Sequence, residues 1–283
     1  MTNVWDLGQR KLKLTRRPLI MGILNVTPDS FSDGGKHNEI SRAIDTALQM
    51  EADGAAIIDI GGESTRPNST PVLANEELDR VMPVISGLSG KLRIPISIDT
   101  SKALVAREAV QNGAEIINDV TGLEGDPEMP KIAVESEVGV CVMHMKGTPQ
   151  TMQNDPSYDD VVEEIYDYLV ARRDFCIKIG IASQRICLDP GIGFGKTHEH
   201  NLTLLRHASR FNDIGSPILV GHSRKGFIGE LLEDKNADRT AATLGVSLAL
   251  AVARTHVLRV HDVKETVDAL TLFEAAGGLE SPG

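Results

Sequence analysis

Eight short apolar runs recur along the chain, and a polar or glycine residue follows each of them. The runs cover residues 20–24, 55–58, 94–98, 116–117, 138–143, 186–188, 217–220 and 256–258. The residues that follow them are Asn25, Asp59, Asp99, Asn118, His144, Asp189, Gly221 and Arg259. Each run is typical of a buried strand, and most of the intervening stretches carry helical signals. This alternation predicts the α/β class and a (β/α)8 TIM barrel, in which all strands end at one mouth and distant residues share one site.

The chain length fits one such barrel. There are 283 residues, and a (β/α)8 barrel typically needs about 250. The same length would hold two ordinary domains, but no linker or shift of composition divides the sequence. We therefore expect residues 1–283 to form a single domain. The first seventeen residues are typical of a short hairpin, which we expect to close the end of the barrel opposite the site.

Charge and cysteine content limit the classes of partner and the compartment. The formal net charge of −11 argues against a general binder of nucleic acid or of anionic membranes. An anionic substrate would need a local basic pocket. No apolar run approaches the roughly 18 residues of a membrane span, and the N-terminus has no signal-peptide core. The three scattered cysteines, Cys141, Cys176 and Cys187, are typical of free thiols in a reducing cytoplasm.

Two connections and one helix stand out from the rest of the repeat. Residues 26–38 and 61–74 are too polar and too rich in Gly and Pro for plain turns, and both would emerge on the face that carries the site. Residues 239–254 form a helix rich in small residues, suited to packing either on a partner subunit or on its own barrel. Further helices are expected over 159–179 and 262–276, and Ser101 is expected to cap one that runs to about Asn112.

The strongest local signal is the glycine-rich segment DPGIGFGKT at residues 189–197. It resembles a phosphate-binding P-loop, but Pro190 stands where that motif needs glycine. Its glycines allow the backbone to come close to a flat ligand. The carboxylate of Asp189 can accept two parallel hydrogen bonds from an amidine-like N–H pair, as guanine and pterin rings present. The alternative is that Asp189 caps the following helix.

Acceptors and cations are expected to gather at the mouth. Asp99, Asn118 and Asp189 form a ring of polar groups among apolar walls, and unpaired carboxylates there indicate ligand N–H groups as partners, although each residue can also cap a helix. Asp59 is expected to support the second loop, His144 to be a buried, hydrogen-bonded side chain, and His198 and His200 to face solvent. The loops after strands seven and eight, a common phosphate site in barrels, carry Arg224, Lys225, Arg259 and His261. We expect Arg224 to be solvated or in an ion pair.

Eight segments together resemble the dihydropteroate synthase family of the bacterial folate pathway. They are residues 21–35 (MGILNVTPDSFSDGG), 58–67 (IDIGGESTRP), 98–102 (IDTSK), 116–119 (IIND), 143–153 (MHMKGTPQTMQ), 188–196 (LDPGIGFGK), 223–225 (SRK) and 258–263 (LRVHDV). The resemblance covers essentially the whole chain. It implies a (β/α)8 barrel, commonly a homodimer, and the condensation of 6-hydroxymethyl-7,8-dihydropterin diphosphate with 4-aminobenzoate to give 7,8-dihydropteroate and pyrophosphate.

The resemblance also implies a role for individual residues. Asp99, Asp189 and Lys225 would be catalytic. The dihydropterin ring would lie against Asp99, Asn118, Met143, Asp189 and Lys225. Asn25 would bind Mg²⁺ together with the diphosphate, and the phosphates would be held by Arg66, Arg259 and His261. The aminobenzoate would be framed by Phe31, Thr65, Pro67, Phe194 and Ser223, where sulfonamides would compete.

Three other functions remain open from the sequence. A pterin-dependent methyltransferase would share the barrel and the pterin acceptors but would have no use for a diphosphate cluster. A Schiff-base aldolase would use Lys225 as its nucleophile. A paralogue that binds pterin without catalysis would keep the acceptors, and the intact loops at 26–38 and 61–74 argue against it.

Overall fold

The barrel predicted from the apolar runs is present. The computed structural model describes residues 3–27, 35–65, 69–234 and 236–280. Its main sheet has eight parallel strands in the order β8-β7-β6-β5-β4-β3-β10-β9. An isolated bridge between Leu188 and Ile218 joins the two ends of that order and closes the ring. The strands are β3 Leu19–Asn25, β4 Ile57–Gly61, β5 Ile96–Asp99, β6 Ala114–Asp119, β7 Gly139–Met143, β8 Ile186–Asp189, β9 Leu219–Val220 and β10 Val257–Val260.

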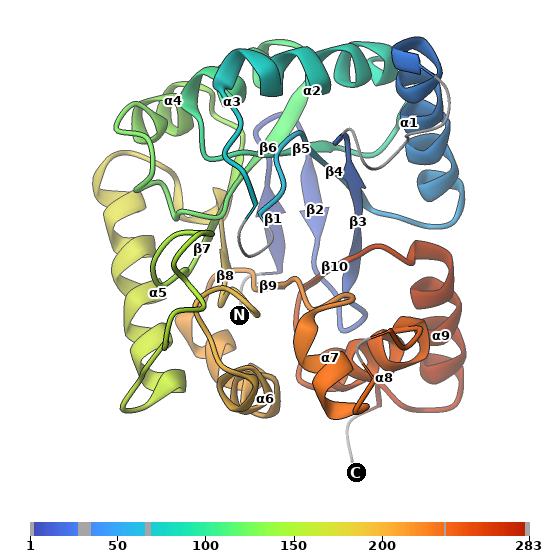
Figure 1. Cartoon of the computed structure of the whole chain (residues 1–283), viewed down its shortest axis with the longest axis vertical. Helices are drawn as coiled ribbons and strands as arrows, with labels where there is room; N and C mark the ends of the chain where they lie inside the picture. The colour runs from blue at the N-terminus through green and yellow to red at the C-terminus, as the bar shows by residue number, and fades with distance from the viewer. Residues whose placement is uncertain (1–2, 28–34, 66–68, 235, 281–283) are drawn as a thin grey trace.

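Helices surround the strands on all sides, as Figure 1 shows. They are α1 Gly35–Ala52, α2 Ala74–Leu88, α3 Ala103–Gln111, α4 Met129–Glu135, α5 Val161–Lys178, α6 His198–Arg206, α7 Gly226–Leu231, α8 Thr240–Val252 and α9 Val263–Ala275. Within the described ranges, none of these helices is both long and apolar enough to cross a bilayer. Apolar side chains from the outer faces of the strands and the inner faces of the helices form one continuous core.

Some predicted boundaries and caps were wrong. β10 continues to Val260, so Arg259 lies inside the strand rather than after it. Because side chains alternate along a strand, Val257 and Arg259 share a face. Ser101 does not cap α3. The helix begins at Ala103, whose N–H donates to Asp126 Oδ2 at 2.8 Å, so the cap comes from a loop distant in sequence.

The N-terminal hairpin closes one end of the barrel, as expected. Strands β1 (Val4–Asp6) and β2 (Lys11–Lys13) are antiparallel and lie in the middle of the ring in Figure 1. Trp5 is fully buried, and its Nε1 donates to the carbonyl oxygen of Arg185 at 2.9 Å. Seven barrel residues pack with Trp5, Leu7 and Leu14 in one cluster: Met21, Ile57, Ile116, Cys141, Cys187, Leu219 and Val257. The hairpin is therefore a hydrophobic plug.

The plug should contribute strongly to stability. Truncation of a fully buried Trp removes its burial and leaves a cavity, so we expect Trp5→Ala to lower the free energy of unfolding by about 3–5 kcal/mol. Urea unfolding followed by circular dichroism measures this change. Lys13→Ala, at an exposed position of the same hairpin, should stay within about 0.5 kcal/mol of the parent. Equal unfolding midpoints for the two variants would contradict the role of the plug.

Candidate active site

A cavity of about 1790 Å³ lies at the carboxyl ends of the strands. Its walls come from loops that are far apart in sequence. Of the residues expected at the site, those that line it are Asn25, Thr65, Asp99, Phe194, Ser223, Lys225, Arg259 and His261. Asn118, Met143 and Asp189 are buried at the ends of β6, β7 and β8. Phe31, Arg66 and Pro67 lie outside the described residues. The fold thus brings most of the predicted site to one mouth.

A guanidinium group joins two carboxylates at the base of this cavity. Arg259 donates from Nε to Asp59 Oδ2 and from Nη2 to Asp99 Oδ2, each at 2.5 Å. Asn118 Nδ2 donates to the same Asp59 oxygen at 3.2 Å. The expectation of unpaired carboxylates was therefore wrong for Asp99. Asp59 does not support the second loop either: it is fully buried, and its Oδ2 holds Arg259 and Asn118.

Burial sets the protonation of this cluster. Burial raises the pKa of Asp99 well above its ordinary value, although Arg259 acts in the opposite direction. Burial lowers the pKa of Arg259, but Asp59 and Asp99 raise it by more, so the guanidinium remains a cation. Burial also raises the pKa of Asp189 to about 6, although the hydrogen bond from the N–H of Gly191 and the charge of Lys225 both act to lower it. At neutral pH Asp189 is mainly a carboxylate.

The glycine-rich segment folds against the end of β7. Asp189 Oδ1 accepts the N–H of Gly191 at 2.7 Å, which orients the carboxylate. Gly191 has a φ of +69°, and a Cβ there would lie 2.0 Å from the carbonyl oxygen of His144, so only glycine fits. At Gly191, the close approach is to the backbone of His144. Asp189 does not cap the next helix, because Thr197 and His200 form the capping box of α6.

Cationic and neutral donors lie at and beyond the ends of β9 and β10. The Nζ of Lys225 lies 4.1 Å from the centre of the Phe194 ring. Ser223 Oγ lies 3.0 Å from Nδ1 of His261. Burial, followed by the charge of Arg259, lowers the pKa of His261 to about 4, so this imidazole is neutral at neutral pH. Arg224 is in an ion pair with Asp262, as expected, and half of its side chain is exposed.

Sequence reasoning assigned no role to Lys196, which lines the cavity although its side chain is 2% exposed. Its Nζ lies 3.0 Å from Nδ1 of His144 and donates to the carbonyl oxygen of Phe194 at 2.8 Å. His144 is buried and hydrogen-bonded, as expected. Burial lowers the pKa of His144 to about 3, so the ring is neutral. Both His198 and His200 are partly buried, and His200 caps α6 instead of facing solvent.

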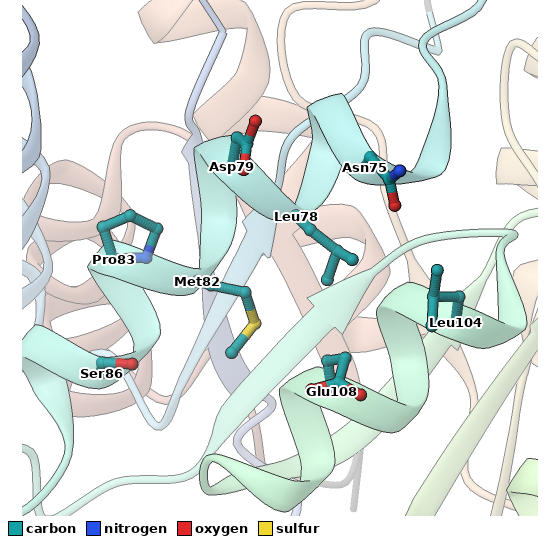
Figure 2. Close-up of a pocket in the computed structure, with 8 residues that line it drawn as sticks. All are labelled: Asn75, Leu78, Asp79, Met82, Pro83, Ser86, Leu104 and Glu108. Carbon is teal, nitrogen blue, oxygen red and sulfur yellow. The ribbon is translucent and has the colours of Figure 1, made fainter.

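A second hollow lies on the outside of the barrel between α2 and α3. It has a volume of about 490 Å³. Figure 2 shows the apolar side chains of Leu78, Met82 and Leu104 beside Asp79 and Glu108. None of the residues that line it is among the buried polar groups of the described chain. Binding sites combine apolar walls with a few convergent, buried polar groups, so the cavity at the mouth is the candidate active site.

The combination of acceptors, cations and a large mouth matches known proteins. A family model for pterin binding enzymes matches residues 21–261. Dihydropteroate synthase from Escherichia coli (strain K12) is 47% identical over 258 residues, which are 91% of each chain. The dihydropteroate synthase of Xanthomonas albilineans, solved with 4-aminobenzoic acid, superimposes with a TM-score of 0.91 at 43% identity and covers 100% of both chains. The structure of the Xanthomonas albilineans enzyme with 7,8-dihydropteroate superimposes with a TM-score of 0.87 at 41% identity, and the match covers 99% of this chain and 100% of that one.

The chain therefore belongs to the pterin-binding enzymes, whose family model matches most of its length. Within that class it belongs to the dihydropteroate synthase family, since the relatives that match nearly its whole length carry that name. None of the relatives named above is a methyltransferase or an aldolase.

Removal of the charge of Asp59 should be costly. It would leave Arg259 with one carboxylate partner in a buried cluster, so we expect Asp59→Asn to lose about 3–5 kcal/mol of unfolding free energy. Thermal and urea unfolding measure the loss. The matched control is Asp268→Asn, which breaks an exposed pair with Lys264 at 2.9 Å and should change stability by at most about 0.5 kcal/mol. An equally small effect at Asp59 would contradict the assignment.

Proposed function

We propose that the cavity joins 6-hydroxymethyl-7,8-dihydropterin diphosphate to 4-aminobenzoate, giving 7,8-dihydropteroate and pyrophosphate. The observation that carries this proposal is that cations suited to a diphosphate line one cavity together with Asp99, while the further pterin acceptors Asn118 and Asp189 are buried at strand ends of the same mouth. The relative from Xanthomonas albilineans has been solved with 4-aminobenzoic acid, which is a substrate of the proposed reaction, and with 7,8-dihydropteroate, which is its product.

The pterin ring would bind at the buried end. Asp189 is ionised at neutral pH and offers an oxygen pair to the 2-amino group and N3–H of the ring. Asn118 would satisfy a further polar edge, and Lys225 would donate to the 4-oxo group and N5. Met143 packs in a small apolar cluster with Val120, Met152 and Phe194, which supplies a wall for the flat ring.

Diphosphate departure would be the first chemical step. The bond between the exocyclic methylene carbon and the diphosphate oxygen breaks, and the oxygen keeps the electron pair. Arg259 is a permanent cation at the cavity wall and would stabilise the leaving charge. His261 would donate a hydrogen bond. Arg66 is proposed for the same cluster. The pterin-methyl cation that remains would be stabilised by the carboxylates of Asp99 and Asp189.

Attack by the aminobenzoate would complete the reaction. The arylamine lone pair forms a C–N bond to the methylene carbon, and the nitrogen gives up one proton. Thr65, Phe194 and Ser223 line the cavity and would frame the arylamine, together with Phe31 and Pro67. No covalent bond to the protein is required, so Lys225 would act as a hydrogen-bond donor and a charge rather than as a nucleophile.

We propose Mg²⁺ as the cofactor, bound by Asn25 and the diphosphate. Mg²⁺ commonly keeps several waters and takes only one or two protein ligands beside substrate phosphates. The donor set fits this mode: Asn25 offers an amide oxygen at the cavity wall, and no three His, Cys, Asp or Glu side chains gather into a metal cluster in the described part of the chain. When bound, the ion would neutralise charge on the leaving diphosphate.

We also propose a homodimer in the cytoplasm. On α8, Thr243, Ser247, Leu250 and Ala251 are buried against the barrel. The opposite face exposes Ala241, Gly245, Ala249 and Val252, a small apolar stripe suited to close approach of a second copy. Leu231 and Leu232 at the end of α7 are also exposed and would extend this surface. The three cysteines are free and buried, which suits a reducing compartment.

One assay tests the function. Pyrophosphate release from dihydropterin diphosphate should require both 4-aminobenzoate and Mg²⁺, and mass spectrometry should detect 7,8-dihydropteroate. Asp99→Asn should lower kcat by about 10²-fold or more, because it removes charge that stabilises the transition state. If no 7,8-dihydropteroate forms when 4-aminobenzoate is present, the proposed reaction is refuted. Unchanged turnover in Asp99→Asn, with substrate binding intact, would refute the role of Asp99.

Affinity for the dihydropterin ring should depend on pH through Asp189. A carboxylate accepts N–H groups only when ionised, and its pKa is about 6 in the free site. Affinity measured by calorimetry should therefore rise from pH 5 to pH 7 and then level off. The buried histidines of the site, His144 and His261, have pKa values of about 3 and 4, below this window. Burial also raises the pKa of Asp99 to about 7 and that of Asp119 to about 6, inside the window, so the Asp189 variant is needed to identify the group. Asp189→Asn should bind weakly and should lose the part of the pH-dependent step that Asp189 contributes; a step as large as that of the parent protein would assign it to Asp99 or Asp119 instead.

A further inference from the structure

One lysine ties the stem of the second loop to two carboxylates. Lys102 lies between β5 and α3, and its Nζ is 2.6 Å from Glu63 Oε2 and 2.6 Å from Glu77 Oε2. Glu63 follows β4 at the start of the loop, and Glu77 lies in the first turn of α2 at its far end. We refer to these three residues as the Lys102 triad. The triad thus links the loop that follows β4 to the loop that follows β5 through two charged hydrogen bonds.

Further hydrogen bonds fasten the two arms of the loop to each other. The other oxygen of Glu63, Oε1, accepts the N–H of Val72 at 2.9 Å, nine positions along the chain. Ser69 Oγ donates to the carbonyl oxygen of Ser64 at 2.5 Å. Glu63 is therefore a clasp: one oxygen closes the loop on itself, and the other anchors it to Lys102.

The stem is also packed against α2. Arg80 Nη1 donates to the carbonyl oxygen of Gly62 at 2.7 Å. A Cβ on Gly62 would lie 2.8 Å from Val81 Cγ1 and 3.0 Å from Glu77 Cγ, so the backbone there lies flat on the helix. Residues on both sides of the clasp consequently have a fixed position relative to the barrel.

The triad contributes little net stability, because removing its charges from water costs free energy. Glu77 is fully buried, and its Oε1 has no hydrogen-bond partner in the part of the chain that the structure describes. Burial lowers the pKa of Lys102, but the hydrogen bonds to Glu63 and Glu77 raise it by more, so the ammonium stays charged. Buried ion pairs often stabilise a fold no better than apolar residues would. Fixed geometry is what such a triad provides.

We propose that Glu63, Glu77 and Lys102 are positioning residues that hold the second loop against the cavity and thereby set affinity for the arylamine substrate. This inference rests on the proposed function, in which Thr65 contacts 4-aminobenzoate. Thr65 is two residues from the clasp, and both Glu63 and Thr65 line the cavity. The proposed pterin contacts Asn118, Asp189 and Lys225 come from other connections and make none of the hydrogen bonds of the triad.

Glu63 is the position to test. Substitution of Lys102 would leave the buried carboxylate of Glu77 without its cation and threaten folding. Glu77 also raises the pKa of Asp99, so its removal would alter the proposed pterin end. Glu63→Ala removes both hydrogen bonds of the clasp but leaves Lys102 paired with Glu77. Glu63→Gln keeps an oxygen for the N–H of Val72 but turns an amide –NH2 group, which cannot accept a hydrogen bond, toward Lys102.

Steady-state kinetics should separate the two substrates. In Glu63→Ala the KM for 4-aminobenzoate should rise about tenfold or more, while the KM for dihydropterin diphosphate stays within about twofold. Glu63→Gln should recover part of the loss. The matched control is Glu115→Ala, which breaks a pair with Arg10 of the same 2.6 Å length near the plug. That variant should leave both KM values unchanged.

Hydrogen exchange provides a readout that needs no activity. Amides in residues 62–65 and 69–73 should exchange faster in Glu63→Ala than in the parent protein, and those of β6 and β8 should not change. Equal increases in both KM values, an unchanged KM for 4-aminobenzoate, or unchanged exchange in the loop would each overturn the inference. If the parent protein makes no dihydropteroate, the proposed function fails, and the exchange comparison still decides whether Glu63 holds the loop.

Discussion

The site depends on one buried guanidinium. Arg259 on β10 binds the carboxylates of Asp59 on β4 and Asp99 on β5. Asn118 on β6 donates a hydrogen bond to Asp59 and so belongs to the same cluster. Two carboxylates this deep in a barrel would repel each other and would be costly to bury alone. With the arginine between them, they stay close and the mouth of the barrel stays polar. Within the described residues, the hydrogen bonds of Arg259 use Nε and Nη2, and we propose that Nη1 meets the anionic substrate.

The opposite end of the barrel is closed by a hydrophobic cluster and contributes stability. There the interior is filled by Trp5, Leu7 and Leu14 from the hairpin rather than by strand residues alone. A well-packed end stabilises the sheet through its hydrophobic contacts. The mouth can then retain charged groups whose net contribution to stability is small. The plug and the acidic mouth are thus complementary, and stability and chemistry occupy opposite ends of the same strands.

The sequence was informative wherever the cause was local. Apolar runs predicted the strands, and their ends predicted Asp99 and Asp189 at the mouth. It failed where a partner is distant. The bond between Asp59 and Arg259 spans 200 positions, and the cap of α3 comes from Asp126 rather than from Ser101. Lys196 follows the glycine-rich segment directly, but its partner His144 is supplied by another strand end. Such pairings follow from barrel closure, which a local pattern does not contain.

The two substrates would be held by structures of different stiffness. The proposed pterin contacts on β6 and β8 are parts of hydrogen-bonded strands, whose positions the whole barrel fixes. The proposed arylamine contacts lie largely on loops, which have no such ladder and need their own anchors. The clasp of Glu63 provides one by a carboxylate that reaches both Val72 and Lys102. An anchor of this kind holds the described arms of the loop against the barrel. The proposed pterin contacts would therefore take their rigidity from the strands, and the proposed arylamine contacts would take theirs from this side-chain anchor.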